Sequence, residues 1–320
     1  MDLIYDYGFF LAKTITVLVA VLIIISAIFS QKGKKTDGLD TDCLNELHKD
    51  QKQKIIKKFK WKHIKKDKKL DLNQLPKLFV LDFNGDMKAS QTQQLREEIT
   101  NIIQLAQAGD EVMLKLESPG GVVNGYGLAA AQLERLRNHS IPLTVCIDQV
   151  AASGGYLMAC IANRIISAPF AIIGSIGVVA QMPNFNKWLK KHNIDFEQIT
   201  AGDYKRTLTM FGENTEAGRK KFSEDLQLIH ENFKNHVLNY RPQLDMKKVG
   251  TGEHWLARDA MQLGLVDELK TSDDFILEKL NHFQMISISQ VKVQSLVEKI
   301  IKPTGNVLSQ IPQMIKRITV

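Results

Sequence analysis

The sequence predicts an α/β domain with largely parallel strands, preceded by one transmembrane helix. A 21-residue apolar run from Phe9 to Phe29 predicts the helix. From Lys77 onward, short apolar runs alternate with helical patterns, and this alternation favours a layered α/β fold. With 320 residues, 44% of them hydrophobic, the chain suits one main domain with appendages rather than a disordered, collagen-like or coiled-coil protein.

The N-terminal apolar run has the length of a membrane span. A helix of this length covers about 31 Å, the thickness of a bilayer core, and its one charged residue, Lys13, lies near the start and can reach the interface. A cleaved signal peptide is the alternative, but its first residues should be basic, whereas Asp2 and Asp6 are acidic. We therefore predict an uncleaved anchor in residues 1–30.

A lysine-rich segment follows the anchor. Residues 31–69 hold 14 lysines and 6 acidic residues, a net charge of +8, whereas the rest of the chain holds 28 basic and 29 acidic residues. A nucleic-acid-binding domain should carry its positive charge on the folded surface, so no nucleic-acid partner is expected. Residues 51–69 interleave apolar side chains with lysine, which fits either a helix lying on anionic lipid or a solvated linker. We assign residues 31–75 to a basic linker.

The main α/β domain is assigned to residues 76–285. Apolar runs bounded by glycine or proline turns predict its strands, which are Leu78–Phe83, Val112–Leu116, Leu143–Ile147, Arg164–Ser167 and Ile176–Ala180.

Helical patterns in this domain come with capping residues. Ser90 and Gln93 form a capping-box pattern before the first helix. A second helix is expected near Tyr126–Leu136, and a long one from Glu216 to Tyr240 with Thr215 as its cap. The apolar residues 168–182 are too few and too rich in glycine for a second span, and residues 286–320 form an amphipathic tail.

Three glycine-containing turns follow strand-like runs. Ser118–Gly121 reads SPGG, and paired glycines let backbone N–H groups face a ligand oxygen, as an oxyanion hole requires. The second turn places Ser153 before two glycines, where a serine is sterically open. The third carries Ser175, a second hydroxyl. Taken singly, each is also compatible with an ordinary tight turn or helix cap.

A nucleophilic serine needs a base, and histidine is poorly placed for this role. None of the eight histidines lies in a glycine-rich turn, and His254 is more typical of a structural residue. Lysine can act as a base where burial lowers its pKa. Lys205 follows a strand-like stretch and a glycine turn, although composition alone would make it a surface lysine. The three cysteines form no C-x-x-C pair, so no thiolate metal site is expected.

These motifs together resemble the signal peptide peptidase A family, peptidase family S49, and within it the SohB branch. The resemblance is carried by SPGG, ASGGY about 35 residues later, GSIGV, and a lysine 52 residues after the serine. Two later blocks, YKRTLTMFGENTEAGRKKF and TGEHWLARDAMQLGLVDEL, fit the same branch. The family consists of membrane-anchored serine proteases with a Ser/Lys dyad.

The resemblance implies a role for each residue singled out above. Ser153 would be the nucleophile and Lys205 the general base. Gly121 and Gly154 would be backbone oxyanion donors, and Ser175 would orient the lysine. The implied fold is ClpP/crotonase-like, with repeated β-β-α units.

The same resemblance implies a homo-oligomer that needs no cofactor or metal. It places the protein in the bacterial inner membrane with its catalytic domain on the periplasmic side, whereas the lysines after the anchor argue for the cytoplasmic side.

The predicted function is therefore a membrane-anchored serine endopeptidase. Its expected substrates are remnant signal peptides or damaged proteins near the membrane. A non-catalytic oligomeric scaffold is one alternative. A crotonase-type acyl-CoA enzyme is another, although that chemistry would not need a serine paired with a lysine.

Overall fold

The computed structural model describes residues 7–20, 39–60 and 71–290. The chain divides into two compact units, residues 1–40 with 290–320, and residues 41–289. In the first unit residues 7–20 are helical. Over the described ranges, no helix is both long enough and apolar enough to cross a bilayer. The predicted span of residues 9–29 lies partly outside those ranges, and residues 61–70 of the lysine-rich segment and 291–320 of the tail lie wholly outside them.

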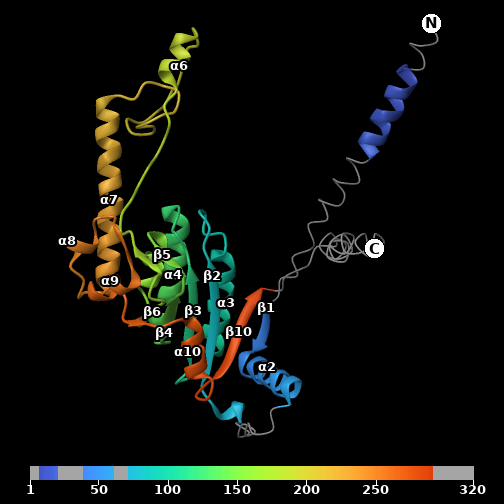
Figure 1. Ribbon diagram of the computed structural model, residues 1–320. Coiled ribbons are helices and arrows are strands. Elements are labelled where there is room, and N and C mark those ends of the chain that lie inside the picture. The colour runs from blue at the N-terminus through green and yellow to red at the C-terminus, as the bar shows by residue number, and fades with distance from the viewer. Residues whose placement is uncertain (1–6, 21–38, 61–70, 291–320) are drawn as a thin grey trace, which may run out of the picture. The chain divides into compact units, whose positions relative to one another are not determined.

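The second unit is built on a parallel sheet, in which the described residues form seven strands (Figure 1). Every neighbouring pair from β10 to β9 is parallel. Because such strands are covered on both faces, they read as continuous apolar runs, and the interior residues of β3 and β4 are nearly all buried. The strand order is β1 (Leu39–Cys43), β10 (Gln284–Gln290), β2 (Lys77–Asn84), β3 (Glu111–Glu117), β4 (Leu143–Ile147), β6 (Arg164–Ser167) and β9 (Glu268–Leu269).

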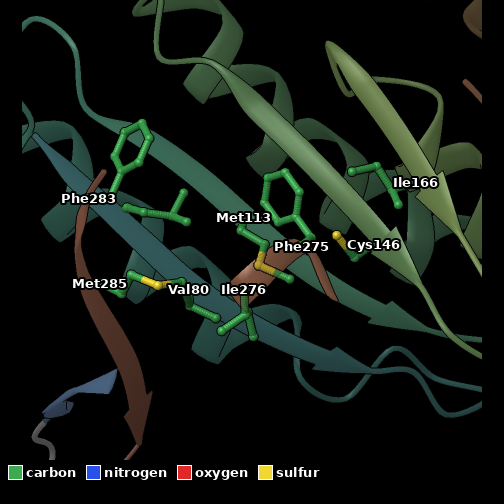
Figure 2. Close-up of a cluster of buried hydrophobic side chains, with 9 residues drawn as sticks. Val80, Met113, Cys146, Ile166, Phe275, Ile276, Phe283 and Met285 are labelled. Carbon is green, nitrogen blue, oxygen red and sulfur yellow. The ribbon is translucent and has the colours of Figure 1, made fainter. Parts of the chain in front are cut away.

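Helices pack against this sheet. The side chains of Phe275 and Ile276 lie in one buried cluster with Met113, Cys146 and Ile166 (Figure 2), so that α10 covers β2, β3, β4 and β6. The helices of the second unit are α2 (Leu44–Phe59), η1 (Leu72–Gln74), α3 (Thr92–Leu105), α4 (Val123–Asn138), α5 (Gly154–Ala159), α6 (Asn186–Lys191), α7 (Glu216–Tyr240), α8 (Met246–Val249), α9 (Ala257–Gln262) and α10 (Ser272–Lys279).

A smaller sheet adjoins the carboxyl end of β3. Its described strands are β5 (Val150–Ala152), β7 (Ile172–Gly174) and β8 (His254–Leu256). β5 pairs parallel with β7, and β7 pairs antiparallel with β8. A parallel bridge joins Ser118, directly after β3, to Ala151 of β5. The three glycine turns of the sequence therefore follow three adjacent strands, β3, β5 and β7.

Most of the predicted elements are confirmed. The strands β4 and β6 have the predicted bounds. The helix α7 has its predicted bounds as well, and the Thr215 side chain accepts a hydrogen bond from the Gly218 N–H. The domain division stays a prediction: β1 and α2 fall inside the predicted linker, and β10 crosses residue 285, where the predicted domain ends.

Three predictions are wrong. The strand-like stretch before Lys205 is not a strand, since residues 194–200 have no regular secondary structure. No strand covers Ile176–Ala180, because the strand is β7, which ends at Gly174; positive φ angles at Gly174 and Ser175 turn the chain there. The capping box does not form either. The Ser90 hydroxyl donates instead to Asp86, 2.7 Å away, and α3 begins two residues later, at Thr92.

Candidate active site

Ser153 occupies a strained position between β5 and α5. Its φ and ψ are 52° and −118°, a conformation that is rare and costly for a residue with a side chain. Its N–H donates to the Gly174 carbonyl at 2.8 Å, and α5 starts at the next residue. The strand, the sharp turn and the helix together hold the half-buried serine at the carboxyl end of β5.

The SPGG turn packs directly against this serine. Ala152 donates to the Ser118 carbonyl at 3.0 Å, and Ser118 donates to the Val150 carbonyl at 2.8 Å. Gly120 has a φ of 88°, and a Cβ placed on it would lie 2.7 Å from both the Gly154 nitrogen and the Ser153 Cβ. Only glycine allows the two turns to approach this closely.

The N–H groups of these turns fall into two groups. The Gly120 N–H donates to Ser118 Oγ at 3.1 Å, and the Val122 N–H donates to the Met87 carbonyl at 2.9 Å. No acceptor among the described residues takes the N–H of Gly121 or of Gly154, and the first N–H groups of a helix have no intrahelical partner. Two unpaired donors beside a serine are what oxyanion stabilisation requires.

Ser175 lies one strand away from Ser153. Ala152 is in register with Gly174, so the two serines follow paired ends of β5 and β7. Ser175 also has a positive φ, 52°, and its N–H donates to the Glu253 carbonyl at 2.7 Å. The structure thus brings together four of the five predicted site residues, Gly121, Ser153, Gly154 and Ser175.

Lys205 is placed differently. It is exposed and belongs to residues 178–215, the arm, which joins β7 to α7. Among the described residues, the hydrogen bonds of residues 184–214 all stay within the arm, and none joins Lys205 to the three turns. Figure 1 shows α6 beside the N-terminal end of α7, away from β4 and β6.

Lys205 borders a cavity within the arm. The cavity has a volume of about 750 Å³. Most of its lining side chains are apolar, among them Met182, Ile199, Leu208, Met210 and Phe211. Lys205 therefore stands beside apolar side chains of its own segment, and its backbone N–H donates to the Gly202 carbonyl at 3.2 Å.

The arm also exposes large apolar side chains. Ile199 is 95% exposed and Val179 is 78% exposed. Further exposed members are Phe185, Trp188, Ile194, Phe196, Tyr204 and Phe211. The Phe211 ring contacts those of Phe185 and Phe196, and monomeric soluble proteins rarely leave large contiguous apolar patches in water, so the arm has the character of a contact surface.

One residue of the site was not identified from the sequence. Tyr126 of α4 is completely buried, and its hydroxyl lies 2.5 Å from Ser118 Oγ. In the sequence it is one more apolar position of a helix, and no motif distinguishes it from a core residue. His254 lies on β8, exposed. No group of three or more potential metal ligands occurs within the described ranges.

Comparison with known proteins identifies the family. Residues 135–285 match peptidase family S49, and residues 2–133 match the N-terminal part of the same family. The chain belongs to peptidase family S49. It is 44% identical to the "Probable protease SohB" of Haemophilus influenzae, over 93% of this chain and 92% of that protein. It is 47% identical to the protein of the same name from Buchnera aphidicola subsp. Acyrthosiphon pisum, over 97% of this chain and 96% of that protein.

A solved structure with a related arrangement is that of a mutant of the 1510-N membrane-bound stomatin-specific protease. It is 14% identical to this chain, covers 64% of this chain and 84% of its own, and gives a TM-score of 0.40. The family assignment makes the chain a serine peptidase of family S49.

Proposed function

We propose that this protein is a membrane-anchored serine endopeptidase with Ser153 as its nucleophile and Lys205 as its general base. The observation that carries the proposal is the geometry of Ser153, held at a φ of 52° against the SPGG turn. The closely packed turns and the parallel sheet also suit the ClpP/crotonase-like fold expected from the sequence.

The mechanism follows from the arrangement of the turns. Ser153 Oγ gives its proton to Lys205 Nζ and attacks the peptide carbonyl, and the N–H groups of Gly121 and Gly154 hold the oxyanion. Each such donor contributes about 3–4 kcal/mol to transition-state stabilisation. Lys205 then protonates the leaving amine, and water releases the acyl group from Ser153. The Ser175 hydroxyl orients the lysine.

We infer that Lys205 reaches Ser153 of a neighbouring copy of the chain. The lysine is exposed, the hydrogen bonds of residues 184–214 stay within the arm, and the arm exposes large apolar side chains. A second copy covering this surface would bury the arm and bring its lysine to the turns. In a symmetric assembly every subunit then contributes its Lys205 to the active site of one neighbour and has its own Ser153 completed by the Lys205 of a neighbour.

Burial in such a contact also suits the chemistry. A lysine acts as a base only without its proton, and desolvation favours the uncharged amine. The apolar side chains around Lys205, such as Ile199 and Met210, would supply this environment once a second copy excludes water. The homo-oligomer is therefore part of the proposed active site.

The proposed location is the bacterial inner membrane, with the catalytic domain on the periplasmic side. Residues 9–29 are the proposed anchor. The helix α2 would add a contact with anionic lipid, because Leu47, Ile55 and Phe59 are exposed on a helix that carries five lysines. Peptides left near the membrane, such as remnant signal peptides, and damaged membrane-proximal proteins are the proposed substrates.

Activity of single variants tests this function. The full chain in detergent should cleave casein, and Ser153→Ala and Lys205→Ala should each lower the rate by at least about 10³-fold while remaining folded. Ser140→Ala is the matched control for the serine, since Ser140 also has a positive φ, 56°. Lys187→Ala is the control for the lysine, since Lys187 is exposed in the same arm.

Two results would contradict the proposal. One is cleavage by Ser153→Ala or Lys205→Ala at the wild-type rate. The other is a wild-type chain that cleaves no peptide, the outcome expected of a scaffold or of an acyl-CoA enzyme. Labelling of Ser153 by a fluorophosphonate would separate the peptidase from both.

A further inference from the structure

Tyr126 contacts both of the turns that carry the proposed oxyanion donors. Its side chain is completely buried on α4. A Cβ placed on Gly154 would overlap the Tyr126 ring, so the ring lies directly against the start of α5. At the other end of the same side chain, the hydroxyl is 2.5 Å from Ser118 Oγ, the first residue of the SPGG turn.

The direction of the hydrogen bonds at Tyr126 can be assigned. The Tyr126 hydroxyl is 2.8 Å from the Asp86 carbonyl, and a carbonyl can only accept. The Tyr126 hydroxyl therefore donates its one proton to the Asp86 carbonyl, and the Ser118 hydroxyl must donate to the Tyr126 oxygen. Ser118 Oγ in turn accepts the Gly120 N–H at 3.1 Å. Burial raises the pKa of Tyr126, which keeps the donating proton in place.

These bonds form one directed chain through the SPGG turn. It runs from the Gly120 N–H to the Ser118 hydroxyl, then to the Tyr126 hydroxyl, and ends at the Asp86 carbonyl. The loop that contains Asp86 also flanks the turn, because the next carbonyl, that of Met87, accepts the Val122 N–H at 2.9 Å. The N–H groups on both sides of Gly121 are thus engaged, and the Gly121 N–H remains available.

We propose that Tyr126 is a positioning residue that fixes the distance and orientation between the Gly121 and Gly154 N–H groups. The inference rests on the proposed function, since it assigns Tyr126 a part in that reaction. The ring sets the position of Gly154, and the hydroxyl sets the position of the SPGG turn. Because oxyanion stabilisation acts in the transition state, Tyr126 acts on kcat and leaves substrate binding nearly unchanged.

Tyr126→Phe isolates the hydroxyl, because it keeps the ring against Gly154. We expect kcat for peptide cleavage to fall about ten-fold or more, with KM within about two-fold of wild type, since displacing a catalytic group by about 1 Å can cost about 10²-fold. Tyr156→Phe is the matched control. Tyr156 is equally buried, and its hydroxyl donates to the Leu265 carbonyl at 3.0 Å, away from both turns.

The control separates positioning from stability. Tyr126→Phe loses two hydrogen bonds and Tyr156→Phe loses one, so both should show a fall in melting temperature, larger for Tyr126→Phe, and only Tyr126→Phe should lose kcat. The proposal is overturned if Tyr126→Phe keeps kcat within about two-fold of wild type. It is also overturned if kcat falls to the same extent in Tyr156→Phe, or if Tyr126→Phe raises KM and leaves kcat unchanged.

A double variant tests whether Tyr126 acts through Ser118. Ser118→Ala breaks the same chain, so adding Tyr126→Phe to it should lower kcat no further, because residues of one network do not contribute additively. If the fall in kcat of the double variant equals the product of the falls in the two single variants, Tyr126 does not act through Ser118.

Wild type and Ser153→Ala are measured in the same assay. If wild type is inactive, or if Ser153→Ala is fully active, the proposed function fails. If Ser153→Ala is inactive while Tyr126→Phe is unaffected, the positioning role alone fails.

Discussion

Replacing Gly120 by alanine should damage both the stability and the activity of the protein. Gly120 has a φ of 88°. The new Cβ would lie 2.7 Å from the Gly154 nitrogen, 2.7 Å from the Ser153 Cβ and 2.8 Å from the Ala152 carbonyl oxygen. Two of these three neighbours are backbone atoms, which cannot rotate away, so the SPGG turn has to move away from Ser153.

The expected loss of stability follows from two costs. Holding alanine at a positive φ costs about 1–3 kcal/mol, and overpacking a tightly packed site costs about 1–3 kcal/mol. The sum, about 2–6 kcal/mol, corresponds to a fall of about 4–24 °C in Tm for a domain of this size. Because the Gly121 N–H moves with the turn, kcat should fall about 10²-fold or more, as for the loss of one oxyanion donor.

Thermal unfolding and casein cleavage measure the two effects. Gly127→Ala is the control, because Gly127 lies in α4 with no atom within 4 Å of its added Cβ, and alanine in a helix should raise stability by about 0.5–1 kcal/mol. A Gly120→Ala protein with the wild-type Tm and the wild-type kcat would refute the reasoning about the packed turns.

Two further predictions concern the scaffold. Glu98 is fully buried and its Oε2 has no hydrogen-bond partner among the described residues, and burial raises its pKa from 4.5 to about 7. The folded state therefore holds a proton that the unfolded state releases, so this contribution, about 3 kcal/mol, is complete below pH 4.5 and is lost as the pH rises through 7. Glu98→Gln should remove that pH dependence from the free energy of unfolding, and an identical pH profile in the variant would count against it. Arg241, 5% exposed, binds both carboxylate oxygens of Asp267 at 2.6 and 2.9 Å. Arg241→Met should destabilise by about 2–4 kcal/mol in denaturant unfolding, and a change below about 0.5 kcal/mol would show that the pair contributes little.

Much of the fold follows from the sequence because its strands are parallel and buried. A strand covered on both faces needs an unbroken apolar run, and LTVCI gives β4 its bounds in the sequence and in the structure alike. A helix cap formed by a side chain can be predicted from the sequence as well, as Thr215 shows at the start of α7. The turns around Ser153 could be identified because glycine pairs and an open serine are unusual together.

Other features depend on contacts that no local pattern reveals. The apolar residues after Ser175 look like a strand, but the turn at Gly174 and Ser175 directs them away from the sheet. Tyr126 has the spacing of a core residue, and its role depends on Ser118 and Asp86, which other elements bring to it. In the proposed site the place of Lys205 depends on a neighbouring copy, and the sequence around Lys205 contains no sign of such a contact.

The most direct test of the proposed active site is the activity of mixed oligomers. Ser153→Ala and Lys205→Ala chains, co-expressed in equal amounts and purified through two different tags, should each be inactive alone. In a mixed assembly half of the chains carry Ser153 and the other half carry Lys205. A site formed by two neighbouring chains is therefore complete in about a quarter of cases, so about a quarter of the wild-type activity should return. Co-assembled variants that are no more active than either variant alone would contradict a site built from Ser153 of one copy and Lys205 of another.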